Sequence, residues 1–121
     1  MPEWTLPSVP ASVPKARDLV TDALVDVASP ALDDIALVVS ELATNCVRHA
    51  KTQFRLCVKH DGDGVHLEVT DYGAGRPAVA NPSPEQTHGR GLYLVEALTR
   101  RWGVIPATGG AGKTVWCTVS L

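Results

Sequence analysis

The apolar residues of this chain change their spacing near residue 50, and this change constrains the fold more than any other feature. Residues 32–50 carry apolar side chains at helical spacing on one face, at Ile35, Val38, Val39, Leu42 and Cys46. Residues 53–60 and 65–70 instead alternate apolar and polar side chains, as half-buried strands do. Because the glycine-containing turn sequence DGDG lies between them at residues 61–64, we expect a long helix followed by an antiparallel hairpin.

The remaining segments complete an α+β pattern. Residues 14–28 are predicted to form a first helix, with Ser12 as its N-cap and Pro14 in its first turn, after an extended segment at residues 1–13. A third helix is expected from about Leu92 to Arg101, and strands at 102–105 and 113–121 around a glycine-rich turn at 109–112. The order predicts a two-layer α+β sandwich, in which three helices cover one face of a mixed, largely antiparallel sheet.

Residues 71–89 show no period and are rich in Gly, Pro, Asn and Ser. A loop of this length is usually functional. We therefore expect residues 72–89 to form a lid over a bound ligand.

Length and charge narrow the class of protein. A chain of 121 residues is predicted to form one domain, residues 1–121. Its formal charge of −2 provides no basic field, so direct nucleic-acid binding is not expected.

Cys46, Cys57 and Cys117 lie in apolar runs, which is typical of buried thiols without a disulfide or metal cluster. No apolar run is long enough to span a bilayer, so we expect a cytoplasmic protein with no membrane contact.

Glu41 and Asn45 are four residues apart and therefore share one face of the second helix. The amide oxygen of Asn45 is a suitable ligand for Mg²⁺, and Glu41 could accept a proton from an attacking hydroxyl. The pair is consistent with half of a phosphoryl-transfer site. Taken alone, such a pair is more often two solvated side chains on a polar helix face.

Two glycine-containing segments could hold the rest of a nucleotide. Asp71 ends a predicted strand and is the first residue of the sequence DYGAG. Its carboxylate could accept a hydrogen bond from the exocyclic amine of a nucleotide base, and the glycines would let the backbone approach that base. The alternative is a simple turn that begins at Asp71. The sequence GRG at residues 89–91 precedes a helix, whose first N–H groups could bind phosphate, although a plain loop-to-helix junction would look the same.

One apparent motif is rejected. Residues 107–114, ATGGAGKT, look like a relaxed P-loop, but a P-loop opens a helix and the residues that follow alternate like a strand. We predict a hairpin turn with the Thr114 hydroxyl facing the sheet. His49 lies near Glu41 and Asn45 and is interpreted as a helix-end residue.

The order of these motifs resembles that of the GHKL ATP-binding superfamily, which has the Bergerat fold. The sequence has Glu-x-x-x-Asn on a helix, Asp-x-Gly-x-Gly after a strand, Gly-x-Gly before a helix and Gly-x-Thr entering a strand. Residues 39–50, VSELATNCVRHA, are similar to the N box of the anti-sigma-factor serine kinase branch, and residues 89–95, GRGLYLV, to its second glycine box. The resemblance covers residues 15–121.

This resemblance implies a role for each matched residue. Glu41 would be the general base, Asn45 the Mg²⁺ ligand and Asp71 the adenine-binding carboxylate. The other cofactor-binding positions would be Gly73 and Gly75 beneath the nucleotide, the phosphate-binding box of Gly89, Arg90, Gly91 and Leu92, and Thr114 supporting the adenine contact. Arg90 could instead contact a partner.

The same resemblance implies a function. Kinases of this branch use ATP and Mg²⁺ to phosphorylate a serine of a STAS-domain anti-anti-sigma partner, and the unphosphorylated partner displaces a bound sigma factor. They are usually homodimers, with the first helix and strand near the interface. Two alternatives stay open, namely a binding module that holds ATP or ADP and sequesters a sigma factor without phosphorylation, and a detached histidine-kinase catalytic domain.

Overall fold

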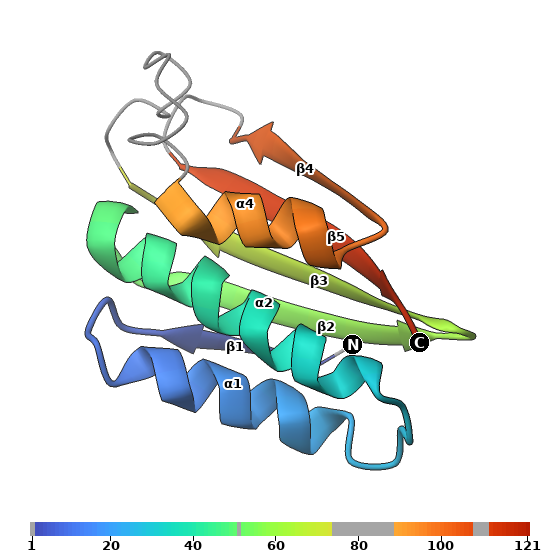
Figure 1. Ribbon diagram of the computed structural model, residues 1–121. Coiled ribbons are helices and arrows are strands. Elements are labelled where there is room, and N and C mark those ends of the chain that lie inside the picture. The colour runs from blue at the N-terminus through green and yellow to red at the C-terminus, as the bar shows by residue number, and fades with distance from the viewer. Residues whose placement is uncertain (1, 51, 74–88, 108–111) are drawn as a thin grey trace.

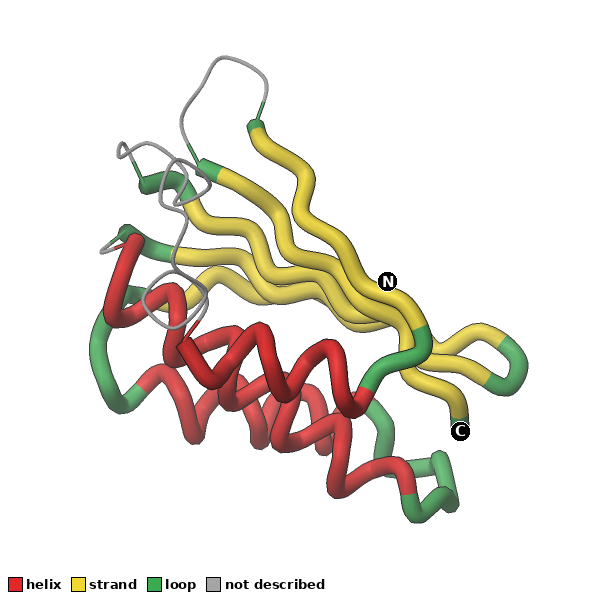
Figure 2. The backbone as a smooth tube through the Cα atoms, turned by 45° about the horizontal axis from the view of Figure 1, so that its top comes forward, coloured by secondary structure: helices red, strands yellow, loops and turns green. Residues whose placement is uncertain are grey.

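The computed structural model describes residues 2–50, 52–73, 89–107 and 112–121, with the backbone alone for residues 89–92. The helices are α1 (Ser12–Ala23), α2 (Ala31–Asn45), a π-helical extension η1 (Cys46–Ala50) and α4 (Gly89–Leu98). The strands are β1 (Glu3–Leu6), β2 (Phe54–Asp61), β3 (Gly64–Asp71), β4 (Arg101–Pro106) and β5 (Lys113–Ser120). The helices lie together on one side of the sheet, as Figures 1 and 2 show. The predicted two-layer α+β sandwich is therefore confirmed.

The five strands form one sheet in the order β1-β2-β3-β5-β4. Every pairing among these described strands is antiparallel, so the expected mixed character is not observed in this part of the chain. The predicted hairpin is β2 and β3, and its turn contains Gly62 with a φ of +63°, a conformation that glycine adopts without steric cost.

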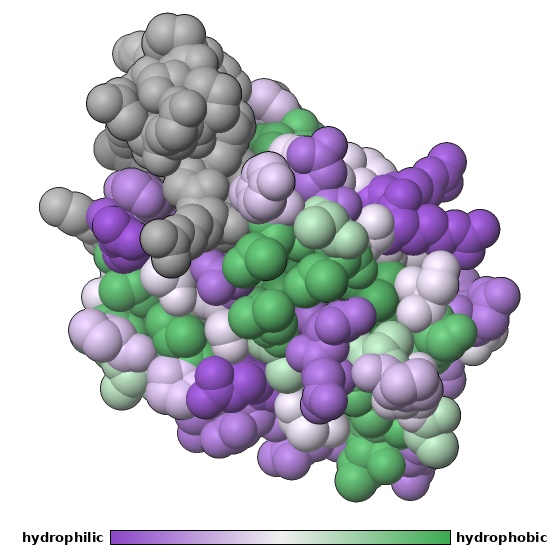
Figure 3. All heavy atoms as spheres, viewed as in Figure 1, coloured by the Kyte–Doolittle hydropathy of each residue, from purple (hydrophilic) through white to green (hydrophobic). Residues whose placement is uncertain are grey.

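The core lies between the two layers because each element has one apolar face. In β3 every second residue is buried, and the buried face of α2 packs onto these strands. The largest fully buried side chains are Phe54, Ile35, Leu42, Leu56 and Leu67. Figure 3 shows apolar side chains also gathered on the outer surface of this face. Among the large exposed side chains of the helices are Leu37 of α2, 40% exposed, and Tyr93 of α4, 74% exposed.

The N-terminal part differs from the sequence-based expectation in two ways. Ser12 is not a cap but the first residue of α1, and its hydroxyl donates to the carbonyl oxygen of Pro7 at 2.6 Å, which stabilises the turn before the helix. The helix ends at Ala23 rather than near residue 28, because Leu24 begins a turn in which the Val27 N–H bonds to the Leu24 carbonyl oxygen at 2.9 Å. Strand β1, within the segment that we expected to be extended, pairs with β2 at the edge of the sheet.

The third helix begins and ends three residues earlier than predicted, at Gly89 and Leu98. The Arg100 N–H donates to the carbonyl oxygen of Thr118 in β5 at 2.8 Å. This bond draws the chain into the sheet, and β4 starts at the next residue. No helix within the described ranges has the length and apolarity needed to cross a membrane.

Candidate functional site

Four elements bring predicted site residues to the same end of the sandwich. The antiparallel arrangement places the C-terminal end of α2 beside the N-terminal end of α4, and the end of β3 beside the start of β5 (Figure 1). The predicted residues Glu41 and Asn45 lie on α2, and Asp71 is the last residue of β3. Segments far apart in the sequence are therefore neighbours at this end.

The flank of α2 that carries Asn45 faces α4. Ser40 marks the opposite flank, because its hydroxyl accepts a hydrogen bond from Arg17 of α1 at 3.1 Å. Successive helical residues are rotated by about 100°, so Ser40 and Asn45 lie on opposite sides of the buried face of α2. Glu41 lies on the same side as Asn45, one helical turn before it. Both side chains are half-buried. They are thus partly accessible at the junction between α2 and α4.

The second helix reaches Ala50, as the sequence predicted, but its α-helical hydrogen-bond pattern ends at Asn45. The next five residues form the π-helix η1, in which Cys46 is buried and Arg48 and His49 are exposed. Short π-helical segments are rare in proteins overall. Those that do occur are often found at functional sites, because they change the direction of side chains along a helix. His49 lies in the last turn, as expected.

Asp71 is a buried carboxylate at the end of β3, with 4% of its surface exposed. Its Oδ1 accepts a hydrogen bond from the Gly73 N–H at 3.1 Å, and its Oδ2 accepts one from the Lys113 ammonium at 2.8 Å. A buried charge is costly unless it is paired and hydrogen-bonded, and both conditions are met here. The carboxylate is therefore held in one orientation.

The electrostatic environment of Cys46 shows how closely these elements approach. The pKa of the Cys46 thiol is raised to about 12, mainly by burial and also by the negative charge of Asp71, while the positive charge of Lys113 lowers it. The ends of α2, β3 and β5 are thus within electrostatic reach of one another.

Two glycines allow the backbone to close around Asp71. A Cβ atom on Gly73 would lie 3.2 Å from the carbonyl oxygen of Ala50, and one on Gly112 would overlap the carbonyl oxygen of Asp71. Gly112 also has a φ of +88°, which favours glycine. Gly112 therefore requires a residue without a side chain, whereas a side chain at Gly73 would need the Ala50 backbone to shift by a few tenths of an ångström.

Thr114 is not brought to Asp71. It lies opposite Thr70 in the β3–β5 ladder, and the two hydroxyl oxygens are 2.8 Å apart on the sheet face away from the helices. The residue opposite Asp71 is Lys113. Sequence reasoning missed Lys113, although a signal was available, since Lys113 shares the alternation of the buried residues Val115 and Cys117.

Other predicted positions can be placed only in part. The helix-opening box of Gly89, Arg90, Gly91 and Leu92 forms the first turn of α4, and its backbone is all that is described. Gly75 and most of the predicted lid, residues 74–88, lie outside the described residues. The rejection of the P-loop is confirmed, because Lys113 opens β5 rather than a helix.

The residues at this end fit a magnesium nucleotide. A buried carboxylate can accept from the amine of a base, Asn45 provides a hard oxygen, and the first turn of α4 provides N–H groups without intrahelical partners. The close backbone contacts at Gly73 and Gly112 hold the chain in place around this carboxylate.

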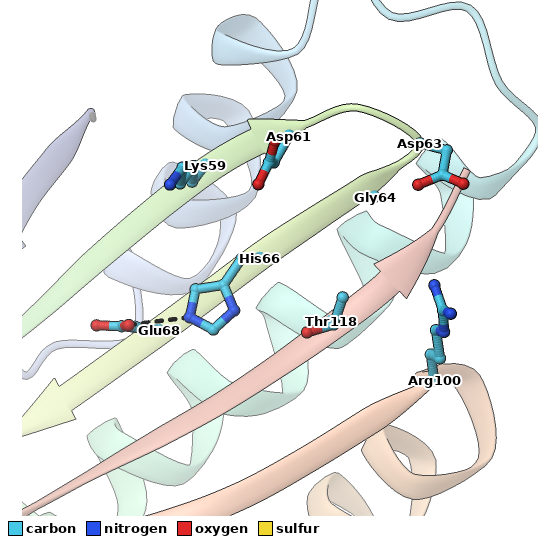
Figure 4. Close-up of a pocket in the computed structure, with 8 residues that line it drawn as sticks. All are labelled: Lys59, Asp61, Asp63, Gly64, His66, Glu68, Arg100 and Thr118. Carbon is cyan, nitrogen blue, oxygen red and sulfur yellow. Dashed lines mark hydrogen bonds and ion pairs between the residues drawn. The ribbon is translucent and has the colours of Figure 1, made fainter.

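A separate hollow of about 550 Å³ lies on the face of the sheet that the helices leave open, at the β2–β3 turn (Figure 4). It is lined by Lys59, Asp61, Asp63, Gly64, His66, Glu68, Arg100 and Thr118. His66 already bonds Glu68 at 2.9 Å, and acidic and basic groups are mixed around it. It is at the opposite end of these strands from Asp71.

Comparison with known proteins agrees with this fold. Residues 6–119 match the family described as "Histidine kinase-like ATPase domain", and the chain belongs to this family. A search of curated proteins finds no match.

Two solved structures share the fold. One is the histidine kinase domain of the blue-light-activated histidine kinase EL346 of Erythrobacter litoralis, with a TM-score of 0.54 and 20% identity over 92% of this chain. The chain covers 60% of that protein. The other is the Acinetobacter baumannii histidine kinase AdeS, with a TM-score of 0.53 and 12% identity, covering 99% of this chain and 68% of that one.

Proposed function

We propose that this domain binds ATP with Mg²⁺ and phosphorylates a serine of a STAS-domain anti-anti-sigma protein, and that it regulates a sigma factor by partner switching. The observation that supports this most is the meeting of the Glu41 and Asn45 helix, the Asp71 carboxylate and the first turn of α4 at one end of the sandwich. The kinase branch is favoured by the similarity of residues 39–50 to its N box.

The proposed roles follow from the chemistry of the side chains. Bound MgATP supplies the phosphoryl group and the metal charge that stabilises its transfer. Asp71 orients the base, Asn45 holds the metal through its amide oxygen, and the α4 N–H groups bind phosphate oxygens. Glu41, one helical turn from Asn45, accepts the proton of the partner serine hydroxyl.

The proposed partners remain a sigma factor and a STAS-domain protein, and the proposed assembly is a homodimer. Strand β1 lies at one edge of the sheet with α1 beside it (Figure 1). An edge strand leaves one row of backbone N–H and C=O groups available for pairing with another chain. This edge is the proposed interface.

Phosphoryl transfer is tested by incubating the purified protein and MgATP with STAS-domain proteins encoded in the same genome, and measuring intact masses. The proposal predicts the mass of one phosphoryl group added to a serine of one of these proteins. Serine-to-alanine replacement at that position should abolish the addition.

The alternative function, a nucleotide-binding module that sequesters a regulator, predicts a different outcome. A stable complex with a sigma factor that depends on nucleotide, without phosphorylation of any STAS-domain protein, would support it. Transfer of the phosphoryl group to a histidine of a separate protein would instead support the third interpretation, a detached histidine-kinase catalytic domain.

A further inference from the structure

We infer that Lys113 is a base-recognition residue, whose ammonium donates to the ring nitrogen next to the exocyclic amine of a bound adenine. This inference rests on the proposed nucleotide-binding function and adds a residue to it. The starting observation is the β3–β5 register, which places Lys113 opposite Asp71 and Thr114 opposite Thr70.

The position of the Lys113 side chain is set by the sheet. Successive residues of a strand point to opposite faces, so Lys113 shares the helix-covered face with Asp71, while Thr114 points to the open face. The Lys113 Nζ atom is 2.8 Å from Asp71 Oδ2, and the two side chains are 30% and 6% exposed. The pair is therefore accessible mainly from the Lys113 side.

The hydrogen-bonding capacity of this pair exceeds what it uses within the described residues. An ammonium has three donors, of which one bonds Asp71, and a carboxylate has about four acceptor positions, of which Gly73 and Lys113 fill two. The pair can thus offer donors beside acceptors on adjacent strands. Adenine carries the matching edge, an amine that donates beside a ring nitrogen that accepts.

The location of Lys113 restricts where it can act. Gly112 directly precedes it, has a φ of +88° and packs against the backbone of Asp71, so the start of β5 is held close to the end of β3. The ammonium is consequently fixed at the same end of the sheet as the base-binding carboxylate. It can contact a base that Asp71 holds, with no need for the chain to rearrange.

A lysine here has a second effect, because its hydrogen bond to Oδ2 orients the Asp71 carboxylate that accepts from the amine. The two effects can be separated experimentally. The effect through Asp71 acts on any base with an exocyclic amine, whereas the direct contact requires the ring nitrogen.

The test compares the binding of ATP and of 1-deaza-ATP, in which a C–H group replaces that ring nitrogen, by titration calorimetry. Since hydrogen bonds to charged groups are typically worth about tenfold or more in affinity, the wild-type protein should bind 1-deaza-ATP roughly ten- to hundredfold more weakly than ATP. Lys113→Met should bind both compounds with similar affinity. Thr118→Val, altered on the same strand but at its other end and on the opposite face, should keep the wild-type ratio.

The outcomes separate this inference from the proposed function. Equal affinity of the wild-type protein for the two compounds would overturn the inference and leave nucleotide binding intact, and this measurement needs no variant to fold. A Lys113→Met protein that keeps the wild-type ratio, or binds ATP more tightly, would also overturn it. Failure of the wild-type protein to bind either compound would contradict the proposed function itself.

Discussion

At the scale of single residues, the proposed site separates the residue that moves a proton from those that hold the nucleotide. Glu41 and Asn45 are half-buried on one flank of α2, whereas Asp71 is almost fully buried between a backbone N–H and an ammonium. Side chains with such different surroundings should respond differently to substitution. Chemistry and binding can therefore be measured separately.

Replacing Glu41 by Gln should slow phosphoryl transfer with little change in nucleotide affinity. General-base catalysis contributes about 10² to 10⁴ in rate, so transfer to the partner serine should fall by that order. The affinity for ATP should stay within about twofold. Single-turnover kinetics and titration calorimetry measure the two quantities, with Glu96→Gln, an exposed glutamate on α4, as the matched control. Unchanged transfer would remove Glu41 from the mechanism.

The buried thiols predict how stability depends on alkaline pH. Burial raises the pKa of Cys117 from 9.0 to about 12, so the folded protein retains a proton that the unfolded chain releases above pH 9. The stabilising effect is complete below pH 9 and is lost as the pH rises towards 12. Each such thiol should lower the free energy of unfolding by about 1.4 kcal/mol per pH unit in this window.

Cys117→Val should remove this contribution because valine does not ionise. Urea unfolding of the variant and of the wild-type protein between pH 8 and about pH 11 measures the difference. Parallel curves for the two proteins over this range would show that the Cys117 thiol does not resist ionisation.

At the scale of elements, the tight approach of β5 to β3 should make Gly112 far less replaceable than Gly62. Both glycines have positive φ, but a Cβ at Gly62 would meet nothing within 4 Å, whereas one at Gly112 would overlap the Asp71 backbone. Gly62→Ala should cost about 1–2 kcal/mol, the strain of a left-handed residue. Gly112→Ala should cost clearly more and weaken ATP binding. Equal losses in urea unfolding would contradict this packing.

Periodicity predicted the elements better than their ends. Apolar spacing was sufficient to locate α2, β2, β3 and β5, because each of these elements buries one face and therefore repeats its apolar residues with a helical or strand period. Several ends depend on contacts between distant residues, such as the bond from Arg100 to Thr118 that ends the third helix and starts β4. Strand β1 was missed for the same reason, since its four residues are a strand only through pairing with β2.

Part of the candidate site was predictable from motif order, and part required the register of the sheet. The positions of Glu41, Asn45 and Asp71 at one end follow from the order of helix and strands. The position of Lys113 rather than Thr114 opposite Asp71 does not, because a shift of one residue in the pairing moves a side chain to the opposite face of the sheet.

At the scale of the whole molecule, nucleotide binding should stabilise the folded domain. A ligand that binds the native state alone, at 100 times its dissociation constant, adds about 2.7 kcal/mol to the free energy of unfolding. For a chain of this length the midpoint of thermal unfolding should rise by roughly 10 °C. We expect the whole domain to be stabilised because the proposed site joins the C-terminal end of α2 to the end of β3 and the start of β5.

The most direct test of the nucleotide site is therefore thermal unfolding with and without MgATP, for the wild-type protein and for Asn45→Ala and Asp71→Asn. We predict a rise of roughly 10 °C for the wild-type protein that both variants lose, while Asp22→Ala, an exposed change on α1, keeps it. An unchanged midpoint for the wild-type protein at millimolar MgATP, or an equal rise in all four proteins, would contradict a nucleotide site at this end of the sandwich.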